Sequence, residues 1–259
     1  MKIAPLALML ALTAGPVLAD GLRDLCVQRP GKATPPCIVD AGHAQIEVGL
    51  ADAVFLRGGG AHEDTYALGA AELRLGLTRR LELEAGWSPV IIDTVRGGAR
   101  RTGAGDATLA LLGALTDPDG KGLAVSAQGF VTVPTATHGL GAGGWTGGVR
   151  LPISLPLSDS TALGFTPEVD LLRDASGGGV HAAWIDVGAI SHSFGSTTLG
   201  VELWGEVEDE PTGVVRRASA DLTAAVVIGK SVQLDAGANF GLNHATPSAE
   251  VYVGLTRRF

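Results

Sequence analysis

The sequence has 259 residues, of which 38 are glycines and 5% are aromatic, and its formal net charge is −8. This length suffices for one large domain or two small ones. The acidic balance argues against nucleic acid as a partner, because binding phosphates requires a basic face.

Residues 1–19 have the pattern of a cleaved signal peptide. Lys2 supplies a positive charge, the apolar run IAPLALMLALTAG follows, and VLA precedes Asp20. An uncleaved anchor helix is the alternative, but the apolar run is shorter than the ~20 residues that span a membrane. We therefore expect cleavage after Ala19 and export of the chain.

Residues 20–42 contain both cysteines of the chain, in the stretch CVQRPGKATPPC from Cys26 to Cys37. In the oxidising compartment that an exported chain meets, two cysteines this close favour a structural disulfide. Metal binding is the weaker alternative, because the stretch offers no histidine and no second pair of thiols. We expect a Cys26–Cys37 disulfide.

From residue 43 onward the chain repeats one unit, in which about ten residues of apolar–polar alternation precede a turn or loop. In LELEAGW, for example, Leu81 and Leu83 share one face, and Glu82 and Glu84 share the other. Such alternation is typical of strands with two unlike faces. The predicted strands are 43–52, 65–77, 81–92, 104–115, 123–134, 145–156, 162–172, 181–191, 198–208, 216–228, 231–242 and 249–259.

Short connections alternate with longer, mostly glycine-rich ones, as in bacterial outer-membrane barrels of even strand number. A soluble β-sandwich is the alternative, but its apolar face would be rich in large side chains, whereas this one is mostly Ala, Val and Leu. A closed barrel also leaves no edge strand to protect. The sequence therefore predicts an all-β, antiparallel, up-and-down transmembrane β-barrel of about 12 strands over residues 43–259, with both termini in the periplasm. Residues 20–42 would form a periplasmic N-terminal segment, too short to fill a lumen.

The chain ends in VYVGLTRRF, where Val251, Val253, Leu255 and Phe259 share one parity. An alternating strand with a C-terminal Phe resembles the signal that the bacterial barrel-assembly machinery reads. We therefore expect Phe259 to be part of an assembly signal. The expected partners are this machinery and outer-membrane lipid, and the expected location is the outer membrane of a Gram-negative bacterium.

Side-chain parity assigns most of the acidic residues in the strands to the lumen. The candidate lumen or selectivity residues are Glu47, Glu72, Arg74, Glu82, Glu84, Asp106, Arg150, Glu168, Asp170, Asp186, Glu202, Trp204, Glu206, Asp221 and Asp235. The acids outnumber the bases, and a buried carboxylate needs water or a partner. Two interpretations stay open: a hydrated path that favours cations or polar neutral solutes, and a closed network of paired charges.

Parity also assigns Trp184 and Trp204 to the inner face. Either ring could stack on a ring-bearing solute or simply fill space. The sequence alone leaves both roles open.

The sequence offers no motif for catalysis, a metal or a cofactor. GLGAGG contains the spacing of a nucleotide-binding loop, but no predicted helix follows it, and the six histidines lack ligand spacing. His192 and Ser193 invite comparison with the barrel phospholipase, but the H-x-S-N-G pattern of that family is absent. We expect no enzyme activity, no metal and no cofactor.

Whole segments of the chain resemble a family of proteobacterial outer-membrane proteins labelled as transporters or as "MetA-pathway of phenol degradation" proteins. The matching segments are CVQRPGKATPPC, GHAQIEVGL, LGLTRRLELEAGWSPV, GAGDATLALLGAL, LGFTPEVDLL and LDAGANFGLNHATPSAEVYVGLTRRF. The resemblance implies an outer-membrane barrel, and the label of the family implies uptake of aromatic compounds. Two functions remain open: a channel or transporter for small solutes, and a structural or surface-interaction barrel with a closed, salt-bridged lumen.

Overall fold

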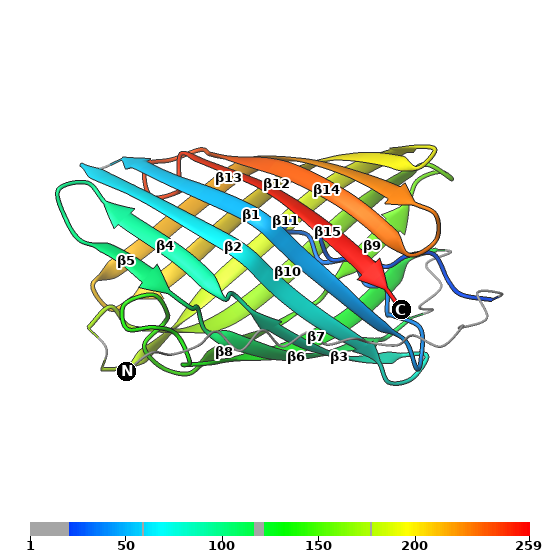
Figure 1. Ribbon diagram of the computed structural model, residues 1–259, viewed down its shortest axis with the longest axis horizontal. Coiled ribbons are helices and arrows are strands. Elements are labelled where there is room, and N and C mark those ends of the chain that lie inside the picture. The colour runs from blue at the N-terminus through cyan, green and yellow to red at the C-terminus, as the bar shows by residue number, and fades with distance from the viewer. Residues whose placement is uncertain (1–20, 59, 117–121, 177) are drawn as a thin grey trace, which may run out of the picture.

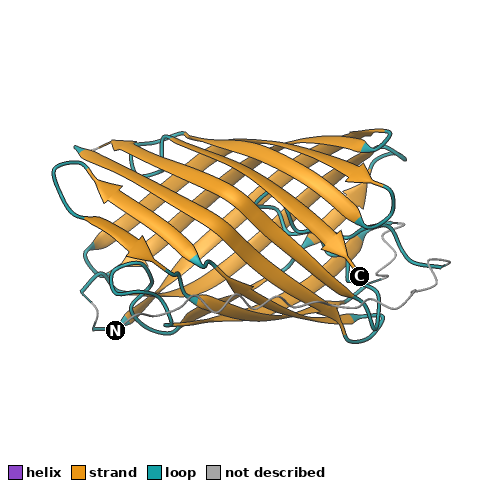
Figure 2. Ribbon diagram, in the orientation of Figure 1, coloured by secondary structure: helices purple, strands orange, loops and turns teal. Residues whose placement is uncertain are grey.

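The computed structural model describes residues 21–259 apart from residues 59, 117–121 and 177, so the predicted signal peptide lies outside the described residues. Within the described part of the chain every regular element is a strand (Figure 2), and no helix is long and apolar enough to cross a membrane. The strands are β1 (Ala44–Gly58), β2 (Ala61–Gly76), β3 (Leu81–Trp87), β4 (Val90–Val95), β5 (Arg100–Gly103), β6 (Ala107–Ala114), β7 (Ala124–Val133), β8 (Thr146–Arg150), β9 (Ile153–Pro156), β10 (Thr161–Arg173), β11 (Val180–Phe194), β12 (Thr197–Glu210), β13 (Gly213–Ile228), β14 (Val232–Gly241) and β15 (Ala249–Arg258).

The strands form one antiparallel sheet that closes on itself, because β1 pairs with both β2 and β15 (Figure 1). Three of the strands that cross the barrel are interrupted once, which gives the successive elements β3 and β4, β5 and β6, and β8 and β9. The described residues therefore form a closed 12-strand barrel. This confirms the predicted all-β, antiparallel barrel fold.

Prolines account for two of the three interruptions. Pro89 lies between β3 and β4, and Pro152 lies between β8 and β9. Proline has no N–H to donate to a neighbouring strand, so the ladder stops at each of them. The carbonyl of Pro152 still accepts the Ser126 N–H at 2.9 Å, and the sheet therefore continues beyond the break.

The two faces of the barrel wall differ in the way the alternation predicts. In β15, Val251 and Val253 are nearly half exposed on the outer face, whereas Tyr252 and Thr256 are buried on the inner face. The same pattern places exposed Leu, Val and Ile side chains around the outside of the barrel and polar or charged side chains inside it. The inner face of the barrel is therefore largely polar, unlike the apolar core of a soluble β-sandwich.

The last strand closes the ring against the first. Gln45 lies opposite Arg258 at one end of the β1–β15 ladder, and the Phe259 N–H donates to the Ala44 carbonyl at 2.8 Å. Arg257 is exposed on the outer face, with its guanidinium 5.4 Å from the centre of the Phe259 ring. The aromatic C-terminus thus sits directly at the seam of the barrel.

The segment before β1 runs inside the barrel. In Figure 1 it is drawn in dark blue and enters from the end at which the C-terminus lies. Residues 26–39, which we call the plug segment, contact inward-facing side chains on β1, β3, β10, β12 and β14. Residues 20–42 were expected to be too short to fill the lumen; residues 26–39 nevertheless run through it as a loop and leave a cavity beside them.

Candidate functional site

The predicted disulfide is present and closes the plug segment into a loop. Cys26 and Cys37 are joined, and Cys26 is buried. Arg74, on β2, donates from Nη1 to the Cys26 carbonyl at 2.8 Å. The disulfide therefore lies against the inner wall, where it holds the two ends of the loop together.

The first part of the plug segment binds acids on β1, β3 and β14. The Glu47 carboxylate accepts the backbone N–H groups of Gln28 and Arg29 at 3.0–3.1 Å. The side-chain amide of Gln28 donates to Glu84 at 2.6 Å. The Arg29 guanidinium lies 3.0 Å from Asp235. Backbone donors and a cation of the segment thus satisfy carboxylates that the parity of the strands places in the lumen.

The middle of the plug segment binds the opposite wall. Glu202, on β12, accepts the Lys32 N–H at 2.7 Å, and the Lys32 ammonium lies 3.1 Å from Asp221 on β13. The same ammonium lies 4.8 Å from the centre of the Trp204 ring, within the range of a cation–π interaction. Trp204 therefore faces inward, as its parity predicts, and it packs against the plug segment.

The end of the plug segment is held by polar and apolar contacts. Glu82 accepts the Val39 N–H at 2.5 Å, and Glu82 also pairs with Arg74 at 2.5 Å. Ile38 and Leu112 form a small apolar cluster with Ala114, which lies on the inner face of β6. The segment is thus fixed along its length to walls that are far apart in the sequence.

Two residues predicted to face the lumen, Asp186 and Trp184, lie on the outer face instead. Asp186, on β11, is exposed on the outer face, where it lies opposite Pro167 and Gly205 of the neighbouring strands. Trp184 is also on the outer face, with 63% of its surface exposed. The inner face of β11 carries buried apolar residues such as Val187, so this strand is apolar on both faces. The alternation in β11 therefore does not indicate which face points inward, and the position of Asp186 suggested the wrong orientation.

The structure places the other candidate lumen residues on the inner face or at its loop end. Two ion pairs are among those not yet described: Arg150 lies 3.1 Å from Glu168, and Glu206 lies 2.8 Å from Arg217. Asp170 lies next but one to Glu168 on the inner side of β10. Much of the lumen charge is therefore paired.

Asp106, just before β6, anchors the loop that follows β7. Its carboxylate accepts the N–H groups of Ala136 and Ala142 at 2.8 Å each. The stretch GLGAGG follows Ala136 closely and is a loop, as predicted. Asp106 thus fixes the glycine-rich loop above the lumen.

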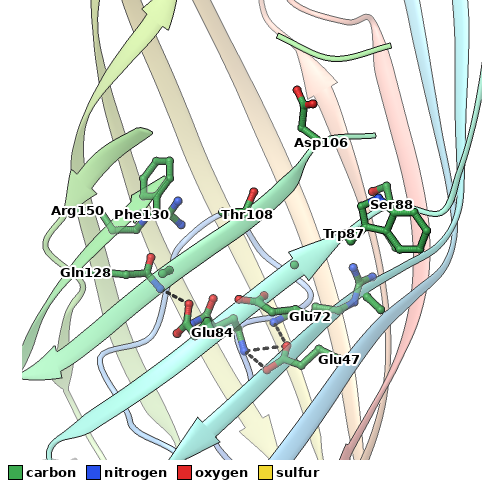
Figure 3. A pocket seen from close by; sticks show the side chains of 16 residues that line it. Glu47, Glu72, Glu84, Trp87, Ser88, Asp106, Thr108, Gln128, Phe130 and Arg150 are labelled. Carbon is green, nitrogen blue, oxygen red and sulfur yellow. Dashed lines mark hydrogen bonds between the residues drawn. The ribbon is translucent and has the colours of Figure 1, made fainter. Parts of the chain in front are cut away.

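A cavity of about 340 Å³ remains between the plug segment and the inner wall formed by β2, β3, β6 and β7, and we call it the lumen cavity (Figure 3). Acids, bases and an aromatic ring share its wall. The lining residues that matter for its chemistry are Glu72, Glu84, Asp106, Arg29, Arg150 and Phe130. The Arg150 guanidinium lies 4.7 Å from the centre of the Phe130 ring, and Gln128 donates to Glu84 at 2.5 Å. The cavity can therefore bind a small molecule that combines a ring with polar or charged groups.

The sequence analysis did not identify the plug-segment residues that contact the inner wall, namely Gln28, Arg29, Lys32 and Thr34. A signal was available. The stretch between the two cysteines contains two cations, and the predicted lumen had an excess of acids. Matching the two would have placed the segment inside.

Residues 27–259 match the protein family described as "Putative MetA-pathway of phenol degradation". The chain belongs to this family. The match covers all of the barrel strands and most of the plug segment. None of the curated protein sequences matches this chain.

Solved structures of outer-membrane barrels resemble this family member in fold. An outer membrane channel from Pseudomonas putida has a TM-score of 0.67 at 15% identity, and the match covers 89% of this chain and 99% of that one. The NanC porin has a TM-score of 0.53 at 10% identity, with 83% and 98% covered. The translocator domain of the autotransporter NalP from Neisseria meningitidis has a TM-score of 0.52 at 14% identity, with 85% and 89% covered. At these identities the likeness extends to the fold.

Proposed function

We propose that this protein is an outer-membrane channel or transporter for small solutes. The expected cleavage after Ala19, the periplasmic position of both termini and the recognition of Phe259 by the assembly machinery belong to this proposal. The 12-strand barrel, its family and its apolar outer face support it. The solute path runs through the lumen, beside the plug segment.

The observation that carries the proposal is the lumen cavity. Its volume of about 340 Å³ lies at the lower end of the range for small-molecule sites. Glu72 and Asp106 offer carboxyl groups, Arg150 offers positive charge, and Phe130 offers a ring face. We infer that the solutes are small aromatic compounds with a polar group, or small cations, which agrees with the phenol named in the description of the family.

A structural barrel with a closed lumen is the second candidate. The contacts between the plug segment and the wall favour it, because Arg29 and Lys32 pair with buried carboxylates across the lumen. Under this alternative the paired charges are there to stabilise the barrel, and the loops carry any function.

Single-channel recording of the refolded protein in a planar bilayer, under a KCl gradient, separates the two candidates. A steady conductance with a cation-selective reversal potential supports the channel. Silence from protein shown to be folded supports the closed barrel. Phenol added to one side should cause brief current blockades that weaken in Phe130→Ala.

A pair of acid-to-amide variants tests whether the lumen cavity lies on the path. Glu72→Gln replaces a carboxyl group of the cavity wall by an amide, which is a poorer ligand for cations, and should lower the cation preference. Asp186→Asn makes the same replacement on the outer face and is the matched control. Equal selectivity in both variants would remove Glu72 from the conduction path.

A further inference from the structure

Three potential metal ligands converge at the loop end of β10, β11 and β12, away from the lumen cavity. Asp174 directly follows β10, His181 is the second residue of β11, and Glu210 is the last residue of β12. Since β11 pairs with both neighbours, the three positions belong to adjacent strand ends. The spacing of the histidines in the sequence does not indicate a metal site. The fold brings the carboxylates of Asp174 and Glu210 next to His181.

The geometry of this cluster suits a single ion. One ligand atom from each side chain lies within 4.8 Å of the other two, and His181 Nδ1 lies 3.0 Å from Asp174 Oδ1. A metal at about 2.0–2.2 Å from imidazole nitrogen and carboxylate oxygen needs ligand atoms at this kind of mutual distance. Small side-chain rotations would bring all three into contact with one ion.

The burial of His181 is a second, independent observation. Its side chain is 6% exposed, and Nε2 is a buried atom without a hydrogen-bond partner in the described part of the chain. A buried ring nitrogen without a partner is costly, because it has lost water and gained nothing in return. With no acceptor or donor among the described residues fixing Nε2, the ring can carry its proton there, which leaves the Nδ1 lone pair beside Asp174 available to an ion.

The carboxylate of Glu210 is oriented before any ion arrives. Its oxygens accept the Ala175 N–H at 2.6 Å and the Thr212 hydroxyl at 2.7 Å. Outer hydrogen bonds of this kind hold ligating carboxylates in metal sites and leave further lone pairs on the oxygens. Two carboxylates and one imidazole also leave a negative charge that a divalent cation would balance.

We propose that Asp174, His181 and Glu210 form a binding site for a divalent transition-metal ion. One imidazole with two carboxylates and no thiolate suits Zn²⁺, and the same set accepts Co²⁺ or Ni²⁺. A water molecule completes the coordination. The bound ion ties together three neighbouring strand ends and the loop that joins β10 to β11.

Zn²⁺ binding to the whole refolded protein in detergent tests the proposal. After treatment with a chelator and its removal, titration calorimetry should show one equivalent of Zn²⁺ per chain. His181→Gln should weaken this binding by about tenfold or more, since loss of even an outer-shell partner costs that much. Co²⁺ should give an absorption spectrum of an ordered site in the wild type and lose it in the variant.

His192→Gln is the matched control. His192 lies in the same strand at its other end, where its ring bonds the Thr161 hydroxyl at 2.8 Å. It should bind Zn²⁺ as the wild type does. Glu210→Gln is a second ligand variant, and the shift in gel mobility between heated and unheated samples shows that each variant is folded. Binding below one equivalent in the wild type, or equal affinity in folded His181→Gln and Glu210→Gln, would overturn the site.

Discussion

The Arg29 guanidinium lies 3.0 Å from the Asp235 carboxylate and joins two residues that are 206 positions apart in the chain. The side chain of Asp235 is fully buried, whereas the side chain of Arg29 is 24% exposed. A buried carboxylate without its cation is unfavourable, so the plug segment and the wall stabilise each other. Any path through the lumen therefore passes beside this contact or breaks it.

Removal of the two cations of the plug segment should open the lumen. In Arg29→Ala/Lys32→Ala, Asp235 and Asp221 lose their partners, and the segment loses its ion pairs with β14 and β13 but keeps its backbone hydrogen bonds. We expect single-channel conductance to rise several-fold, with the barrel still folded. Arg257→Ala, on the outer face, is the control. An unchanged conductance in the double variant would show that the plug segment does not limit the current.

Arg74 should be the most sensitive single position for stability. Its buried guanidinium pairs with Glu47 at 2.7 Å and with Glu82 at 2.5 Å. Arg74→Met leaves two acids without their cation, and we expect a loss of about 3–5 kcal/mol in the free energy of unfolding. Reversible unfolding in urea and detergent, followed by tryptophan fluorescence, measures it.

Two further variants test whether the loss of stability comes from the buried ion pairs of Arg74. Arg74→Lys keeps the charge but loses the planar fork, so it should lose less than Arg74→Met. Arg100→Met, in an exposed position, should have little effect. Equal stability of Arg74→Met and Arg100→Met would contradict the importance of the buried pairs.

Loss of the disulfide should loosen the plug segment but spare the barrel. Cys26 and Cys37 are 11 residues apart, and a link of this length contributes about 2–3 kcal/mol on the loop-entropy model. In Cys26→Ser/Cys37→Ser we expect faster amide hydrogen exchange in residues 26–39. Exchange in β15 should stay as in the wild type, because its ladder with β1 does not involve the segment. Equally fast exchange in both regions would instead mean that the disulfide supports the whole barrel.

Asp186 should respond in the opposite direction to the lumen acids. It is exposed on the apolar outer face, where lipid contact disfavours a charge. Asp186→Leu should therefore raise stability, by less than the ~2–4 kcal/mol that a basic residue costs at mid-membrane. Glu82→Leu should lower it, because Arg74 would lose a partner. Urea midpoints of the two variants provide the comparison, and destabilisation by Asp186→Leu would place that residue against protein rather than lipid.

The sequence was sufficient for the barrel because strand parity is a local property. In β15, Val251 and Val253 alternate with Tyr252, and the structure shows the outer and inner faces that this pattern predicts. In β11 both faces are mostly apolar, so the alternation does not show which face points inward, and Asp186 lies on the outer face. Local alternation fixes the orientation of a strand only where its two faces differ in polarity.

The contents of the lumen could not be predicted in the same way. Glu202 looked like a residue of an aqueous path, yet it accepts the backbone N–H of Lys32, 170 positions away in the chain. Contacts of this kind depend on how a loop without periodicity threads a closed ring. Nothing in the alternation of β12 distinguishes an acid that faces water from one that binds a loop.

The closure of β1 against β15 also has a consequence for the order in which the protein assembles. Glu47, one partner of the plug segment, lies on the first strand, whereas Glu202 and Asp235 lie on β12 and β14. The plug segment therefore gains its full set of contacts only when β12 and β14, which come late in the sequence, are in place. Enclosure of this segment thus belongs to a late stage of barrel formation, because residues from both ends of the sequence have to meet inside the ring.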